Sequence, residues 1–337
     1  MREQKGMDAV VLAGGVAKGA FLAGAISVLA KAGLRVRRVV GTSSGALCAA
    51  HYARAIRSGT EASAGDELAR IWLEEGTLTD GFTVSARGIA RLEGISTSAK
   101  VLGLLRRHVP PATARVPVDV RLVTTDAAGV SARLAPGREG TTFERVLRYE
   151  GTTLDDEPGL ESLFSGVAAS SALPGAFIPY PLAIDGRPVP CVDGGLTNNT
   201  PLKYAIEDAP DIDRVFVIVP YPTVLGPPLE LRGVSLVAQL VEIMVAERLY
   251  RDLREAYSVN ATLARLEAEV PDGEARAAAL RAFGWSNRRR LEIVEIRPTV
   301  PLEGGPFDGF LSRPLREDYV SMGRQVAESW VCSRGVR

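Results

Sequence analysis

The feature of this sequence that most restricts its fold is a strand, a sharp turn and a helix in direct succession. Val36 to Val40 reads as a buried strand, and residues 46–52 read as the helix that follows it. Between them stands Gly41-Thr42-Ser43-Ser44-Gly45, a G-x-S-x-G motif. Such a turn holds the central hydroxyl above the sheet, and the glycines on both sides leave room for the backbone. Ser43 is therefore a candidate nucleophile.

A serine hydroxyl needs a base to take its proton, and the usual base is histidine. The chain has two histidines, His51 and His108. His51 follows Ser43 on the expected helix and lies about 12 Å along the helix axis, out of reach of the hydroxyl. His108 ends an amphipathic stretch just before two prolines and reads as a surface residue. The expected base is therefore a carboxylate.

Asp193 is the candidate carboxylate. Pro188 to Val192 reads as a short strand that ends in Asp193-Gly194-Gly195, and α/β proteins place their sites at strand ends. Asp-Gly is also a common pair in tight turns, so an ordinary turn residue is the alternative reading of Asp193. Asp126 ends another apolar strand and is the reserve base, although a strand-terminal aspartate is more often structural.

A glycine-rich segment, Gly14-Gly15-Val16-Ala17-Lys18-Gly19, lies between a first apolar strand and a helix. Backbone N–H groups at such a helix start point toward negative charge, which in serine acyl transfer is the oxyanion. A nucleotide phosphate fits less well. A P-loop needs a lysine followed by serine or threonine, whereas Lys18 precedes Gly19, and a dinucleotide fingerprint needs glycine where Val16 stands.

Over residues 7–300 the chain resembles the patatin-like phospholipases, a family of serine hydrolases that use a Ser-Asp dyad. Four segments carry the resemblance, in the family's order. They are the glycine-rich segment 14–19, the elbow 41–45, Ala169-Ser170-Ser171-Ala172-Leu173-Pro174, and Asp193-Gly194-Gly195 with Asn198, Asn199 and Pro201.

The resemblance implies a role for each matching residue. Ser43 would be the nucleophile and Asp193 the base, and the amides of Gly14, Gly15 and Val16 would form the oxyanion hole. The supporting residues would be Lys18, Gly41, Gly45, Gly194 and Gly195.

Two positions depart from the family pattern: Val16 replaces a glycine, and Lys18 stands where arginine is frequent. The N–H of Val16 can still donate, unless the backbone there requires a positive φ. Lys18 keeps the charge but loses the bidentate fork of arginine.

Apolar strands near Val10, Val39, Val120, Val189 and Val217 alternate with helices, which favours a sheet covered by helices on both faces. The resemblance implies a three-layer α/β sandwich around a mostly parallel sheet. We expect one domain over residues 1–337. Its motif-bearing core would span about 7–221, and helices with a late strand and a final helix would follow over about 229–333.

Residues 77–107 interrupt the alternation of strands and helices. The stretch is rich in glycine, serine and threonine and then becomes helical, with Val101, Leu104 and Leu105 on one face. Such a segment could be a mobile lid over an acyl pocket. The amphipathic spacing favours a helix that covers the core.

The charge and cysteine content limit the classes of partner and bound ion that we expect. Lys plus Arg and Asp plus Glu number 40 each, so no strong field would attract nucleic acid or anionic lipid. Cys48, Cys191 and Cys332 are far apart and imply neither a disulfide framework nor a zinc site. No hydrophobic leader precedes the first strand, so we expect a cytoplasmic protein. Membrane contact, if any, would be peripheral and would rely on local apolar surface.

The expected function is hydrolysis of lipid acyl esters, of phospholipase A or lysophospholipase type, without a cofactor or metal ion. The same dyad would serve a small-ester carboxylesterase or an acyl thioesterase. A weakly catalytic lipid-binding or regulatory protein is the alternative from a different class. Its basis is the pair of departures at Val16 and Lys18.

Overall fold

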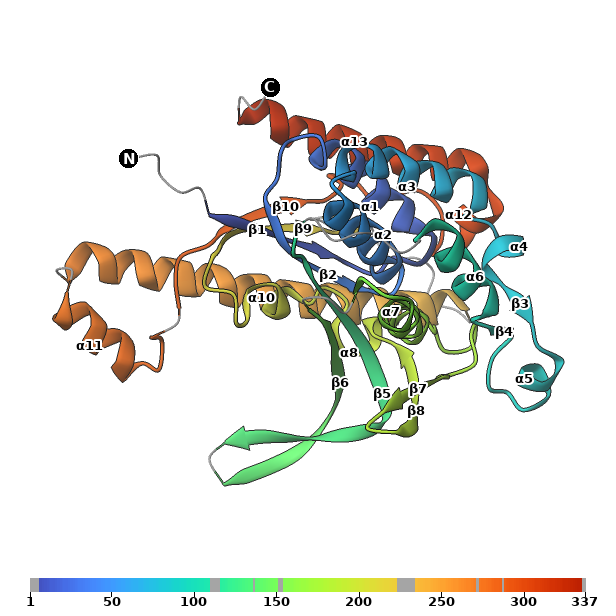
Figure 1. Cartoon of the computed structure of the whole chain (residues 1–337), viewed down its shortest axis with the longest axis horizontal. Helices are drawn as coiled ribbons and strands as arrows, with labels where there is room; N and C mark the ends of the chain where they lie inside the picture. The colour runs from blue at the N-terminus through green and yellow to red at the C-terminus, as the bar shows by residue number, and fades with distance from the viewer. Residues whose placement is uncertain are drawn as a thin grey trace.

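The computed structural model describes residues 6–109, 116–135, 137–150, 154–222, 234–270, 273–286 and 288–334. A sheet of eight strands runs through the molecule in the order β10-β9-β1-β2-β5-β8-β7, with β6 paired to β5 (Figure 1). Strands β3 and β4 form a separate small sheet. The strands are β1 (Met7–Leu12), β2 (Val36–Thr42), β3 (Thr83–Val84), β4 (Ser96–Thr97), β5 (Asp119–Ala135), β6 (Arg138–Tyr149), β7 (Tyr180–Ile184), β8 (Arg187–Asp193), β9 (Ile212–Ile218) and β10 (Glu292–Ile296).

Helices flank the sheet and connect most of its strands. They are the short 3-10 helix η1 (Val16–Lys18), α1 (Gly19–Leu29), α2 (Ser44–Ser58), α3 (Glu61–Glu75), α4 (Leu78–Gly81), α5 (Ala86–Ala90), α6 (Ala99–His108), α7 (Glu157–Ser170), α8 (Gly195–Asn198), α9 (Leu202–Ile206), α10 (Val234–Glu269), α11 (Glu274–Ala282), α12 (Asp308–Leu311) and α13 (Arg313–Ser333). No helix of the described ranges is long and apolar enough to cross a membrane.

The sheet is mostly parallel. β10, β9, β1, β2 and β5 run parallel to one another, whereas β6 and β8 pair antiparallel with β5, and β7 pairs antiparallel with β8. Helices α1, α2, α3 and α13 lie on one face, and α10 lies on the other (Figure 1). The expected α/β sandwich is therefore confirmed.

Alternating side chains of the central strands build two cores. On β1, Val10 and Leu12 join the core beneath α1 and α2, while Val11 joins a second core beneath α9 and α10. The neighbouring strand β9 divides its residues in the same way. Burial on both faces explains why these strands are continuous apolar runs in the sequence.

The last helix, α13, packs directly on the first one, α1. A Cβ added to Gly24 would lie 2.1 Å from the Val320 carbonyl oxygen, and one added to Gly323 would lie 2.1 Å from the Phe21 oxygen. The two helix backbones therefore touch, which only glycine permits. β10 extends the same sheet beyond β9, so residues after 229 supply both a strand and a helix to the main core.

The structure also contains elements that the sequence analysis did not identify. β5 continues to Ala135 and pairs with β6 in a hairpin that projects from the body (Figure 1). The expected helix at 46–52 is the middle of the longer α2. The expected boundary between core and additional helices, near 221–229, lies largely outside the described residues.

We expect Gly24→Ala to destabilise the protein by about 2 kcal/mol or more, because the added methyl group must push α1 away from α13. The matched control is Gly103→Ala in α6, where no atom lies within 4 Å of the added Cβ. There, the better helix propensity of alanine should leave stability unchanged or raise it by up to about 1 kcal/mol. Thermal and urea denaturation would measure both changes. Equal stability of the two variants would contradict the close packing.

Candidate active site

Two strands that approach from opposite directions share one edge of β5. β2 pairs with that edge until Thr42, which lies opposite Val123, and β8 pairs with the next position, where Asp193 lies opposite Thr124. β6 also pairs with Thr124, so it occupies the other edge. The ends of β2 and β8 therefore meet, which brings Ser43 and Asp193 together although 150 positions separate them in the chain.

Ser43 occupies the turn between β2 and α2. Its backbone has φ 55° and ψ −126°, a region that L-residues rarely adopt. A Cβ on Gly41 would lie 2.5 Å from the Gly45 oxygen, and one on Gly45 would lie 2.1 Å from the Leu12 oxygen. Both glycines thus allow α2 to start close to the sheet, which is the elbow geometry expected from the sequence.

Ser170 connects the elbow to the strand that carries Asp193. The Ser43 N–H donates to Ser170 Oγ at 3.0 Å, and Ser170 Oγ donates to the Val123 carbonyl at 2.6 Å. The Gly194 N–H donates to the Ser170 carbonyl at 3.1 Å. In the sequence Ser170 stands out only as part of a motif, because its structural role depends on contacts that no local pattern reveals.

Asp193 is a buried carboxylate beside Ser43, and both residues line the same cavity. The Gly195 N–H donates to Asp193 Oδ1 at 2.7 Å. Burial raises the pKa of the Asp193 carboxyl to about 6, although the neighbouring Ser43 side chain and the Gly195 N–H lower it. At neutral pH this carboxylate is ionised and is a stronger base than an ordinary aspartate.

We expect turnover to rise with pH through about 6, because only the ionised Asp193 can accept a proton. Below that pH the carboxyl group becomes protonated and the rate should fall about tenfold for each further pH unit. The pH dependence of kcat/KM for a soluble ester, with folding checked by circular dichroism at each pH, would measure this. A rate that stays constant from pH 7 down to pH 4.5 would exclude this carboxyl as the base.

The glycine-rich segment lies against Ser43, but two of its amides are already engaged. The Gly14 N–H donates to the Asn199 carbonyl at 3.2 Å, and the Gly15 N–H donates to Ser44 Oγ at 2.9 Å. Within the described part of the chain, the Val16 N–H has no hydrogen-bond partner. The backbone of Val16 has φ 53°, which is strained for a β-branched residue. This is the condition under which the sequence analysis expected valine to be unfavourable.

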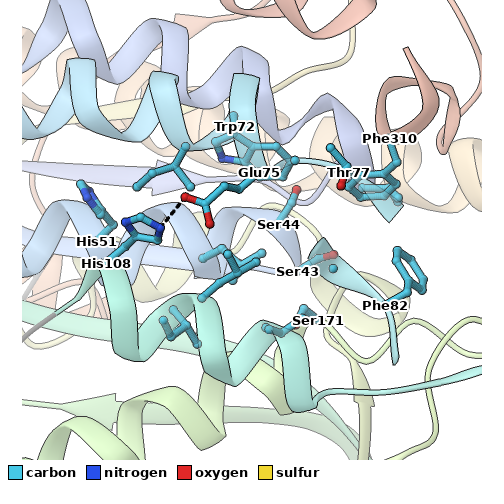
Figure 2. Close-up of a pocket in the computed structure, with 18 of the residues that line it drawn as sticks. Ser43, Ser44, His51, Trp72, Glu75, Thr77, Phe82, His108, Ser171 and Phe310 are labelled. Atoms are coloured by element: carbon cyan, nitrogen blue, oxygen red, sulfur yellow. Dashed lines mark hydrogen bonds and ion pairs between the residues drawn. The ribbon is translucent and has the colours of Figure 1, made fainter. Parts of the chain in front are cut away.

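A cavity of about 140 Å³ opens next to Ser43 and Asp193 (Figure 2). Its walls are mainly apolar and come from α2, α3, α6 and the segment after α7. α6 is thus a covering helix, as the sequence favoured, and it also supplies part of the wall. Side chains that line the cavity include Leu47, Trp72, Phe82, Leu104, Phe177 and Phe310.

Both histidines line this cavity at a distance from the serine. His108 Nε2 lies 2.7 Å from Glu75 Oε1, and in Figure 2 both imidazoles lie at the Glu75 end of the cavity, away from Ser43. His108 is largely buried, so its reading as a surface residue was wrong; α6 turns its apolar face, and His108 with it, toward the core. Burial lowers the pKa of His51 to about 4, so this imidazole is neutral at pH 7.

The other candidate residues have structural surroundings. Asp126, the reserve base, accepts hydrogen bonds from Arg145 at 2.7 Å and from the Ala128 N–H at 2.9 Å, and it pairs with Cys191 of β8 rather than with the strand end at Asp193. The Lys18 side chain is buried on η1. Among the described residues, no three His, Cys, Asp or Glu side chains gather as metal ligands.

The α/β fold and the elbow are typical of hydrolytic proteins, and comparison of the chain with known proteins identifies the family. The sequence model of the patatin-like phospholipases matches residues 10–206. The chain belongs to the patatin-like phospholipase family, which places it among the lipid acyl hydrolases. No curated protein sequence matches the chain.

Solved structures of bacterial proteins resemble the chain distantly. VipD from Legionella pneumophila is 13% identical with a TM-score of 0.36, over 96% of this chain and 67% of VipD. The type III effector ExoU is 13% identical with a TM-score of 0.33, over 98% of this chain and 54% of ExoU. A structure of ExoU with SpcU from Pseudomonas aeruginosa has 14% identity and a TM-score of 0.27, over 94% of this chain and 70% of that chain. The chain thus spans 54–70% of the length of these chains.

Proposed function

We propose that the protein hydrolyses acyl esters of phospholipids or lysophospholipids through a Ser43–Asp193 dyad. The observation that carries this proposal is the buried Asp193 carboxylate, which the pairing of β2 and β8 with β5 places beside Ser43 at the wall of an apolar cavity. Burial makes Asp193 a stronger base, and the mainly apolar walls of the cavity suit an acyl chain.

The reaction would proceed in two steps. Ser43 Oγ attacks the ester carbonyl while Asp193 takes the hydroxyl proton, and the same carboxyl then returns the proton to the leaving alcohol. A water molecule, activated by Asp193, next attacks the acyl-serine and releases the fatty acid and Ser43. Each proton thus passes through one carboxyl group, as in general acid–base catalysis.

The oxyanion would be stabilised first by the Val16 N–H. The amino-terminal end of α2 begins at Ser44, so its dipole favours negative charge at the same place. The Gly15 N–H would become a second donor if Ser44 Oγ turned away when substrate binds. Gly14 would contribute by lacking a side chain, which lets the glycine-rich segment lie close to Ser43. A Cβ on Gly14 would lie 2.9 Å from Ser43 Cβ.

The second candidate is a weakly catalytic protein that binds lipid. The observation that favours it is the engagement of the Gly14 and Gly15 amides, which leaves one described donor for the oxyanion. Loss of a single such donor typically costs about 10²- to 10³-fold in rate. Comparison of a phospholipid, a lysophospholipid, a small ester and an acyl thioester as substrates would separate a lipase from an esterase, a thioesterase and a binding protein.

We expect a fluorophosphonate probe to label Ser43, because the elbow directs only this hydroxyl toward Asp193. Ser43→Ala should abolish both labelling and turnover. The matched control is Ser44→Ala, which removes the neighbouring hydroxyl and should retain the label. Peptide mapping by mass spectrometry would identify the labelled residue. Labelling that persists in Ser43→Ala would refute the assignment of the nucleophile.

We expect Asp193→Asn to lower turnover by about 10²- to 10⁴-fold, because an amide cannot accept the proton. The raised pKa means that folding penalises the charged form, and the penalty grows as pH rises from about 4 to 6. The same variant should therefore be more stable than the wild type at pH 8, by up to about 3 kcal/mol.

The control for the base is the double variant His51→Gln and His108→Gln. Since neither imidazole lies near Ser43, it should keep most of the turnover. Circular dichroism and thermal denaturation would establish that both proteins fold. If the folded double-histidine variant were inactive while Asp193→Asn remained active, the base would be a histidine and the protein would be a Ser-His hydrolase.

A further inference from the structure

The segment from the end of β3 to the start of β4 exposes four large aliphatic side chains to solvent. We call Val84, Ile89, Leu92 and Ile95 the apolar rim; Leu92 is 95% exposed and Val84 is 73% exposed. Single exposed aliphatic residues are ordinary on soluble proteins. Four of them within twelve residues indicate a surface that contacts something apolar.

The backbone holds the apolar rim firmly in place. The Ser85 N–H donates to the Ile95 carbonyl at 2.8 Å, and the Ile95 N–H donates to the Gly175 carbonyl at 3.3 Å. Leu92 has φ 56°, a strained conformation for leucine, although its side chain packs on little. The segment is therefore fixed to the loop after α7 and directs Leu92 outward.

Aromatic side chains connect the apolar rim to the cavity beside Ser43. Phe82, which directly precedes β3, stacks on Phe177 with ring centroids 4.8 Å apart and meets Phe310 edge to face at 5.8 Å. All three rings line the cavity, and Figure 2 shows Phe82 and Phe310 on the side of Ser43 opposite His108. On neighbouring α12, Leu311 is also exposed. Phe82 thus joins the start of the rim segment to the apolar lining of the cavity.

The chemistry of this surface suits a lipid bilayer. Its exposed groups are aliphatic. Arg87 on α5 and Arg91 directly after α5 are exposed beside them, where they can meet phosphate groups. Glu93, the single acidic residue between Val84 and Ile95, pairs with Arg91 at 3.9 Å, so the segment has one more arginine than acidic residues. Aliphatic side chains flanked by arginine are typical of protein surfaces that lie in the membrane interface.

We propose that the apolar rim inserts into the interfacial layer of a phospholipid bilayer and brings the side of the cavity lined by Phe82, Phe177 and Phe310 to the lipid surface. An acyl chain could then move from the bilayer toward Ser43 without crossing water. This inference rests on the proposed lipid hydrolysis, because the bilayer contains the proposed substrate.

The test compares the double variant Val84→Glu and Leu92→Glu with the control Phe283→Glu. Phe283 is 67% exposed, and it follows α11, which lies at the opposite end of the molecule (Figure 1). None of these residues lines the cavity. The readouts are cosedimentation with phosphatidylcholine vesicles, turnover of phospholipid in those vesicles, and turnover of a short soluble ester.

We expect the rim variant to lose about tenfold or more in vesicle binding and in vesicle turnover. The substitutions remove the aliphatic contact with the bilayer, and insertion would require the two glutamates to leave water. Its turnover of the soluble ester should stay within about twofold of the wild type. The control should match the wild type in all three measurements. Unchanged vesicle binding by the folded rim variant would overturn the proposal, and so would a wild type that does not bind vesicles.

A second variant reports on insertion directly and does not depend on catalysis. The emission of Leu92→Trp should shift to the blue when phosphatidylcholine vesicles are added, and that of the wild type should not. Failure of the proposed function would appear separately, as absent turnover of every ester in proteins that still bind vesicles. A dimer that forms without lipid and is lost in the rim variant, with no shift in Leu92→Trp, would assign the surface to a second copy of the chain instead.

Discussion

Hydrogen bonding along one edge of β5 determines where the chemistry can occur. Thr42 and Asp193 end two different strands, and both are held by adjacent residues of β5. Adjacent positions on a strand are only about 3.3 Å apart, so pairing alone brings Ser43 and the carboxylate within reach. Ser170 adds a cross-connection between the two strand ends. The proximity of Ser43 and Asp193 therefore follows from sheet register more than from the side chains themselves.

The site combines several features that oppose stability. Asp193 is a buried carboxylate with a raised pKa, so its charged form costs free energy of folding. Val16 and Ser43 are two of the five non-glycine residues with positive φ in the described structure. Such strain persists only where the surroundings enforce it, and it is frequent at functional sites. Here the sheet and the touching backbones of α1 and α13 supply the rigidity.

The sequence was most informative where structure is locally encoded. The elbow at Ser43, the five central strands and the late strand β10 follow from apolar runs and glycine positions. The engagement of the Gly15 amide could not be predicted, because it depends on the orientation of the Ser44 side chain. The burial of His108 depends on how α6 packs, and the antiparallel hairpin depends on pairing that no local period specifies. These are tertiary effects that override local preference.

The contact between α1 and α13 has a consequence for biosynthesis. Residue 313 follows residue 19 by 294 positions, so at 5–20 residues per second roughly 15 s to 1 min separates their synthesis. During that time the apolar residues of α1 lack the helix that later covers them. Exposed apolar surface of this kind is bound by chaperones or leads to aggregation. The yield of folded protein in the cell should thus depend on protecting α1 until α13 emerges from the ribosome.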